Sequence, residues 1–444
     1  MWEFPTELSP VLHLAPHAHI ISTAVNVING EILILTNTGI LISHGITSED
    51  SEQVHHEPWD LNLITEQPSD TSWFAVKIVS ETGAIVCLSH SGHIVSVASN
   101  RLTDEWADEP EAEGCVEAGI AAAAWNPDES VLVLATHNDS LLCMTSSFEL
   151  VSESPTLPRT PDSPCLLSWR GDGLQFSMYS IDVSDSIAKV RLFNKDLELL
   201  FEGRNVGDGA LAAVKNLLPA MAYATNGSLV AVAQQRTPKK QQIVFLERSG
   251  LRHGEFDLQD PSPPPEGWRG SGTCCVVHLE WNLESTLLAV VLEHEGSGKM
   301  MAGEGQDPIS TPYRTVQLYH RNNYYWYLKQ QWSGQGLWSL GFDVEVPDRL
   351  YLSEKRVLQE HANGASGVCL RMVNMIWDTC VSLTPDCSCV VMDGKQLKVT
   401  PLGKAVIPPP MCKYTLSLPA ACQHVSFGST AGGTGWVLAA LCDE

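Results

Sequence analysis

Ala124-Trp-Asn-Pro-Asp-Glu-Ser-Val-Leu-Val-Leu-Ala-Thr136 decides the fold, because the same pattern returns three more times along the chain. Each copy has an apolar strand that ends in an aromatic residue, then a polar turn, then a strand of small and β-branched residues. The aromatic residues recur after 44, 54 and 58 residues, slightly more than the roughly 40–45 residues of one propeller blade. The pattern therefore predicts a β-propeller with Trp125, Trp169, Tyr223 and Trp281 in the cores of its blades.

Val316–Gln330 has the pattern of a β-hairpin. Its first strand alternates apolar and polar residues, and Arg321-Asn-Asn323 interrupts it with residues that favour turns. The returning strand begins Tyr324-Tyr-Trp-Tyr327, so it is aromatic on both faces. We therefore expect neither face of this strand to lie open to water.

Composition supports an all-β fold. The chain has 444 residues and is 44% hydrophobic and 18% charged, with 33 Gly and 26 Pro, which is typical of a turn-rich globular protein. The repeat weakens after Trp338 and resumes at Met372–Val381. We predict a WD40-type β-propeller over residues 1–335 and a partial second WD40-type propeller over residues 336–444, cut short at Glu444.

The net charge limits the partners of this chain. It carries 27 Lys and Arg against 52 Asp and Glu, a formal charge of −25 at pH 7. Because phosphate groups are bound mainly by Lys and Arg, we expect no direct tight binding of nucleic acid. The N-terminus lacks signal-peptide features and no run reaches the ~18 apolar residues of a membrane helix. We therefore expect a protein of the cytoplasm, and also of the nucleus, with no membrane partner.

Two glycine-rich segments have only part of a phosphate-binding pattern. In Gly296-Ser-Gly-Lys299, Glu293 replaces the first glycine of a P-loop and Met300 replaces the Ser or Thr after the lysine. A flexible loop is the favoured interpretation. Gly432-Gly-Thr-Gly435 precedes a strand instead of a helix, so it is expected to be a turn.

The remaining candidates for a chemical site have simpler structural explanations. His55 and His56, near Glu57 and Asp60, have metal-binding side chains but fit an exposed acidic loop better. The acidic run Asp104–Glu113 is expected to be a solvated loop, with a basic partner as the alternative. The 13 Cys lack zinc-site spacing and fit free thiols in a reducing compartment. We predict no catalytic, cofactor-binding or metal-binding residue, and no enzyme.

Five stretches, in order, resemble the Elongator complex protein one family, the large scaffold subunit of Elongator (the IKAP family). The first resembles its "W-S-P-D" blade, with Asn126 in place of the serine, and the fourth resembles its "N-Y-H-W-Y-L-K-Q" segment. The stretches are Ala124–Thr136, Trp169–Gly173, Gln242–Gly254, Tyr324–Gln330 and Val406–Cys412.

The resemblance implies the N-terminal portion of a protein with two tandem WD40-type propellers and a helical solenoid. It implies a non-catalytic scaffold that supports carboxymethyl-type modification of wobble uridine in tRNA. The implied partners are the catalytic radical-SAM/acetyltransferase subunit and a second WD40 subunit; no cofactor is implied. Dimerisation in the family belongs to the solenoid, which we expect to be absent from this chain. The alternative is an unrelated WD40-like protein-interaction adaptor.

Overall fold

Strands make up nearly all of the computed structural model. It describes residues 2–7, 12–13, 20–26, 31–45, 58–64, 72–100, 105–107, 109–156, 158–205, 213–237, 240–261, 264, 270–296, 312–322, 324–357, 366–376, 387–404, 406–407, 411–429 and 436–442. In this part of the chain, the 3-10 turn η1 (Leu61–Leu63) is the sole helical element, and no helix is long and apolar enough to cross a membrane. The predicted all-β fold is confirmed.

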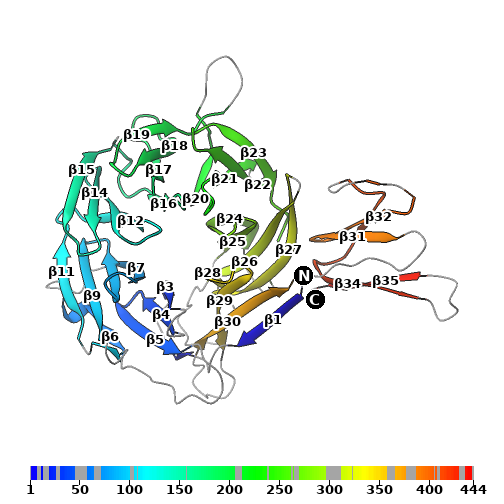
Figure 1. Cartoon of the computed structure of the whole chain (residues 1–444), viewed down its shortest axis with the longest axis horizontal. Helices are drawn as coiled ribbons and strands as arrows, with labels where there is room; N and C mark the ends of the chain where they lie inside the picture. The colour runs from blue at the N-terminus through cyan, green and yellow to red at the C-terminus, as the bar shows by residue number, and fades with distance from the viewer. Residues whose placement is uncertain are drawn as a thin grey trace.

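Seven antiparallel sheets of four or five strands are arranged in a ring (Figure 1). Each sheet is one blade of a β-propeller, which buries its faces against its two neighbours. The first three blades are β3 (Ile20–Asn26), β4 (Glu31–Thr36), β5 (Ile40–Gly45) and β6 (Trp59–Asp60); β7 (Trp73–Val79), β8 (Ala84–Ser89), β9 (His93–Asn100), β10 (Glu105–Trp106) and β11 (Glu111–Cys115); and β12 (Ile120–Trp125), β13 (Val131–Thr136), β14 (Ser140–Thr145) and β15 (Leu150–Pro155).

The next three blades have four strands each, in chain order from the centre of the ring outward (Figure 1). They are β16 (Leu166–Trp169), β17 (Gln175–Ile181), β18 (Ala188–Asn194) and β19 (Leu199–Glu202); β20 (Leu217–Tyr223), β21 (Leu229–Thr237), β22 (Lys240–Glu247) and β23 (Arg252–Asp257); and β24 (Gly270–Trp281), β25 (Leu287–Gly296), β26 (Tyr313–Asn322) and β27 (Tyr325–Gln335).

The seventh blade is built from both ends of the ring. Its strands are β28 (Trp338–Phe342), β29 (Arg349–Val357), β30 (Ser366–Ile376), β1 (Trp2–Glu7) and β2 (Leu12–His13). β1 pairs with β30 over its whole length, from Trp2 opposite Ile376 to Glu7 opposite Arg371. The structure thus differs from the expected division after Gln335, because residues 338–376 belong to the sheet that the N-terminal strand completes.

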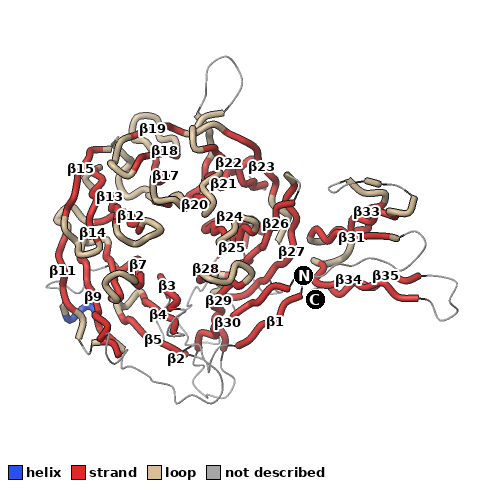
Figure 2. Tube along the Cα trace, viewed as in Figure 1, coloured by secondary structure: helices blue, strands red, loops and turns tan. Residues whose placement is uncertain are grey.

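Two smaller sheets lie beside the ring, next to β27 (Figure 2). One contains β31 (Ser388–Asp393), β32 (Gln396–Pro401) and β33 (Tyr414–Ser417), and the other contains β34 (Cys422–Ser429) and β35 (Trp436–Cys442). They are the first strands of the second propeller.

One turn geometry is repeated in the four blades that carry the sequence repeat. The amide after each aromatic residue donates to the carbonyl five residues on, as from Asn126 to Val131 at 2.9 Å. The fourth residue after each aromatic has a left-handed backbone, with φ between 57° and 72° at Glu129, Gly173, Gly227 and Ser285. The amide of this left-handed residue donates to the carbonyl three residues before it, as from Glu129 to Asn126 at 3.0 Å, and such a backbone favours glycine. Two of the four copies have a bulkier residue there.

Three of the four predicted core aromatics are buried. Trp169, Tyr223 and Trp281 are 8%, 5% and 7% exposed, and the two tryptophan indoles donate to main-chain carbonyls of a preceding blade at 3.0 and 3.2 Å. Trp125 is only half-buried, and its indole N–H makes no hydrogen bond. The inner strands β7 and β12 leave a cavity of about 330 Å³ beside it, so this aromatic is not enclosed as predicted.

Candidate functional site

The outer strand of the sixth blade, β27, is covered on both faces. Trp326 and Leu328 point into the ring and pack in one cluster with Trp281. Tyr327 and Lys329 project the other way, toward β31 and β32. Residues 326, 327 and 328 are 8%, 1% and 3% exposed, so the predicted double burial is confirmed there, whereas Tyr325 at the strand's start is 36% exposed.

A polar cluster joins β27 to the second propeller. We call it the joint; its residues are Gln259, Tyr325, Tyr327, Lys329, Asp393 and Lys398. Asp393 lies at its centre and is 2% exposed. Its carboxylate accepts hydrogen bonds from the Gln259 side chain at 2.7 Å and the Leu328 amide at 3.1 Å. It also forms an ion pair with the Lys398 ammonium at 2.7 Å. One carboxylate therefore ties together two blades of the ring and a strand of the second propeller.

The two lysines of the joint have different electrostatic environments. Burial lowers the pKa of Lys398, but its hydrogen bonds to Asp393 and Tyr325 outweigh burial, and the net pKa is raised. Lys329 donates to the Met392 carbonyl at 2.8 Å and lies 4.8 Å from the centre of the Tyr327 ring. Burial lowers its pKa to about 8, because a carbonyl and a ring compensate an ammonium less well than a carboxylate does.

A close backbone approach completes the joint. The Gly394 amide donates to the Leu328 carbonyl at 2.8 Å, and Gly394 has a left-handed backbone with φ of 58°. A Cβ atom at this glycine would lie 2.0 Å from the Gln259 side-chain oxygen. The left-handed backbone favours glycine here, and a side chain would also displace the Gln259 amide from the joint.

The chemistry of the joint is that of a fixed contact. The Asp393 carboxylate, the Lys398 ammonium and the Tyr325 hydroxyl bond to one another, whereas the Tyr327 hydroxyl is buried without a hydrogen bond. Neither a nucleophile beside a base nor a group of convergent ligands occurs among these six residues. The arrangement holds the ring and the strands of the second propeller together.

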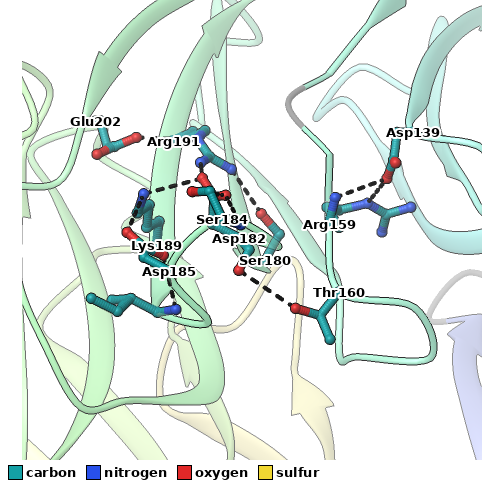
Figure 3. Close-up of polar contacts among 11 residues, drawn as sticks. Asp139, Arg159, Thr160, Ser180, Asp182, Ser184, Asp185, Lys189, Arg191 and Glu202 are labelled. Atoms are coloured by element: carbon teal, nitrogen blue, oxygen red, sulfur yellow. Dashed lines mark hydrogen bonds and ion pairs between the residues drawn. The ribbon is translucent and has the colours of Figure 1, made fainter.

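A second polar cluster links the third and fourth blades (Figure 3). The Asp182 carboxylate accepts hydrogen bonds from the Ser184 amide at 3.0 Å and from Arg191 at 2.6 Å. The amide of Ser184, followed by its hydroxyl and Lys189, holds the pKa of Asp182 well below its usual range. Arg191 is 2% exposed and also binds Ser180 and Glu202, at 3.1 and 3.2 Å.

This second cluster extends across the boundary between blades. Arg159 pairs with Asp139 of the third blade at 3.1 Å and forms a β-bridge with Asp182 of the fourth (Figure 3). Lys189 pairs with Asp185 at 2.9 Å within the fourth blade. The ion pairs therefore lie on either side of the boundary, and the backbone joins the two sides, through the β-bridge and the hydrogen bond from the Thr160 amide to the Ile181 carbonyl at 2.8 Å.

The structure places few of the weighed site residues together. His55, His56 and Glu57 lie outside the described residues, as do Ser297–Lys299 and Gly432–Gly435. Asp60 accepts a hydrogen bond from the Asn62 amide at 3.0 Å and begins η1. Gly296 is the last residue of β25. Within the described ranges, no group of three or more His, Cys, Asp or Glu is arranged to hold a metal ion.

The acidic run Asp104–Glu113 is not simply a loop. Asp104 lies outside the described residues, but β10 and β11 both pair with β9. Trp106 is 5% exposed and packs in a hydrophobic core, which anchors the acidic residues as a blade edge. Glu111 and Glu113 remain exposed to solvent.

No disulfide joins the cysteines whose side chains the structure describes. Cys87, Cys143, Cys165 and Cys422 are buried, as predicted, whereas Cys115 and Cys387 are exposed. Burial raises the pKa of the Cys274 thiol to about 11, so this thiol is protonated near neutral pH.

Sequence reasoning missed the joint. Asp393-Gly394 has the pattern of any hairpin turn, and Gln259 precedes a proline-rich stretch. One feature of the sequence did point to the joint. The strand β27 is aromatic on both faces, and a single propeller would have left the second of these faces exposed to water.

A ring of blades that carries the first strands of a second propeller through a buried polar joint defines a tandem β-propeller protein. A family model described as the ELP1 first N-terminal beta-propeller matches residues 5–161 and 153–337. A second, described as the ELP1 N-terminal second beta-propeller, matches residues 391–444. The chain belongs to the Elongator complex protein 1 family.

Curated relatives agree with this assignment. Elongator complex protein 1 of Mus musculus is 29% identical over 370 residues, covering 72% of this chain and 25% of the relative. The Schizosaccharomyces pombe protein of the same name is 27% identical over 402 residues, covering 78% and 28%. That of Saccharomyces cerevisiae is 23% identical over 379 residues, covering 67% and 24%. The chain thus spans about a quarter of the length of the relatives it matches.

Proposed function

We propose that this chain is a non-catalytic scaffold component of Elongator that supports carboxymethyl-type modification of wobble uridine in tRNA. Family membership supports a place in that complex. The joint is the observation that carries the scaffold role, because its carboxylate and its two ammonium groups are held by fixed partners between the ring and the second propeller.

The joint gives a scaffold what it needs, which is a fixed geometry. Asp393 bonds to groups from the fifth-to-sixth blade connection, from β27 and from β32. Two propellers held in this way present their faces at one angle to other subunits. A flexible linker would instead leave relative domain motion as the default.

The proposed partners are the catalytic radical-SAM/acetyltransferase subunit and a second WD40 subunit, with the cytoplasm as the main location and the nucleus as a further one. The charge of −25 supports contact with proteins in preference to direct binding of tRNA by this chain. The reaction would then take place on the catalytic subunit.

Co-purification tests this proposal. The tagged chain should be expressed in cells of its source that lack the endogenous copy, followed by mass spectrometry of bound proteins and of wobble nucleosides in tRNA. We expect Elongator subunits among the bound proteins, and less modified nucleoside when Asp393→Ala replaces the native chain. Asp196→Ala is the control, because Asp196 is an exposed carboxylate in the turn between β18 and β19.

Two outcomes would contradict the proposal. If no Elongator subunit is recovered with the chain and its loss leaves wobble uridine modified, an unrelated adaptor is the better explanation. If subunits are recovered equally with both variants and modification is unchanged, the complex assembles without the fixed joint.

A further inference from the structure

A groove lies between the outer strands of the fifth and sixth blades, beside the joint. Its volume is about 350 Å³, within the range of ligand-binding clefts. Five of its nine lining residues are aromatic. The lining residues are Arg236, Glu255, Phe256, Asp257, Gln259, Tyr319, Tyr324, Tyr325 and Trp326.

The rings of Phe256, Tyr324 and Tyr325 reach solvent, whereas those of Tyr319 and Trp326 are buried. Phe256 is half-buried and stacks on Trp326 with ring centres 5.1 Å apart. Tyr325 is 36% exposed, and Tyr324 at the tip of the hairpin is 83% exposed. Large aromatic rings that remain in contact with water beside a groove mark a binding surface more often than a structural one.

The backbone holds Tyr324 in an unusual conformation. Its φ is 62°, a left-handed value that is uncommon for a bulky aromatic residue and that costs conformational energy. The guanidinium of Arg321 lies 5.6 Å from the ring centre. The ring is therefore supported on one side and offered to solvent, although asparagine or glycine would fit this backbone with less strain.

The charged groups of the groove favour a basic partner. The lining holds two carboxylates, those of Glu255 and Asp257, and one guanidinium, that of Arg236. Asp257 pairs with Arg236 at 2.8 Å and Glu255 with Arg252 at 3.2 Å. Both carboxylates are more than 40% exposed, and exposed pairs of this kind are weak enough for an incoming cation to compete.

We propose that this groove binds an extended, proline-rich segment of a partner protein that carries an arginine or lysine beside its prolines. Proline rings pack well on flat aromatic surfaces, and a polyproline helix loses little conformational entropy on binding. The basic residue pairs with Glu255 and Asp257. The prolines lie over Tyr324 and Tyr325, whose rings are the most exposed in the lining.

The groove shares Tyr325 with the joint. The Tyr325 hydroxyl accepts a hydrogen bond from Lys398 at 3.1 Å, so the second propeller positions this wall of the groove. Separation of the joint therefore weakens the binding of the peptide, even though no residue of β31 or β32 lines the groove.

Fluorescence anisotropy with a labelled synthetic peptide tests the proposal. The probe is one arginine followed by seven prolines, titrated with the whole chain, and the reference probe is one arginine followed by seven alanines. We expect micromolar affinity for the proline probe alone. Tyr324→Ala should weaken it about tenfold, because one exposed aromatic contact is lost. Tyr414→Ala is the control, since Tyr414 on β33 is 55% exposed and does not line the groove.

A second variant tests the ion pair between the groove and the basic residue of the peptide. Glu255→Gln should weaken the arginine-containing probe several-fold and leave an octaproline probe unchanged. Thermal unfolding of each variant checks that the ring is intact. The proposal is overturned if the proline probe does not bind by about 1 mM, if the alanine probe binds equally well, or if Tyr324→Ala and Tyr414→Ala have the same effect. It is also overturned if replacing Pro263, Pro264 and Pro265 by alanine raises the affinity tenfold, because the chain's own prolines would then be the occupant.

Discussion

Replacing Asp393 by asparagine removes one negative charge from the joint and keeps the shape of the side chain. The amide oxygen still accepts hydrogen bonds from Gln259 and from the Leu328 amide, but it no longer neutralises Lys398, which is 8% exposed. Removing one partner of a buried ion pair costs about 3–5 kcal/mol, because an uncompensated charge remains. Since the asparagine retains the neutral hydrogen bonds, we expect about 3 kcal/mol, the lower end of that range.

The loss should appear in the docking of the second propeller and not in the ring. Native-state hydrogen exchange resolves these regions, because local opening has its own free energy. We expect peptides from β31 and β32 to exchange faster in Asp393→Asn, with little change in β16 to β19. Asp196→Asn, an exposed carboxylate, should leave both regions unchanged.

A double-mutant cycle isolates the ion pair. Lys398→Met alone should also weaken docking, because it leaves the buried Asp393 carboxylate without its cation. The double variant should be less destabilised than the sum of the two single changes. The reasoning is refuted if Asp393→Asn leaves the exchange of β31 and β32 unchanged, or if the coupling energy lies within about 0.5 kcal/mol of zero.

Four further outcomes are expected. Trp281→Ala should lower the free energy of unfolding by about 3–5 kcal/mol, measured in urea, whereas Leu283→Ala at an exposed site should have little effect. Gly171→Ala should cost about 1–3 kcal/mol, because its Cβ would lie 1.6 Å from a main-chain oxygen of the neighbouring turn; Gly254→Ala, which has nothing within 4 Å, is the matched control. The pKa of Lys329 is lowered from 10.5 to about 8 in the folded chain, so between these pH values the unfolded chain binds more protons than the folded chain. The free energy of unfolding should therefore rise with pH in this window by up to about 1.4 kcal/mol per pH unit. Lys329→Met should remove that slope, and an unchanged slope would contradict the assignment. A gel-shift series near physiological salt should show no sub-micromolar tRNA binding, and tight binding would mean that a local basic surface overcomes the net charge.

Local patterns predicted the individual blades well. The four aromatic positions each precede the same turn, and its geometry depends on a few neighbouring residues. Asn126 shows this, because its side chain accepts a hydrogen bond from the Val131 amide at 2.9 Å and closes the turn. Such interactions span five residues and leave a mark in the sequence.

Contacts between distant segments were harder to predict. Trp125 has the same local pattern as Trp169, yet its environment depends on how closely β7 approaches β12. Asp393 and Gln259 are far apart in the chain, and neither belongs to a recognisable motif. The aromatic residues of β27 predicted that something covers the second face of that strand, but not which segment does so.

The seam between β1 and β30 has a consequence for biosynthesis. Trp2 leaves the ribosome well before its partner Ile376, because the two residues lie far apart in the chain. The first six blades can form from consecutive hairpins as they emerge, but the ring stays open until the strands of the seventh blade have been translated. Until β30 has been made, β1 has no partner strand, and the open edge of the sheet and β1 itself can pair with other chains. Synthesis of this protein should therefore depend more on chaperones at this one stage than during the completion of any single blade.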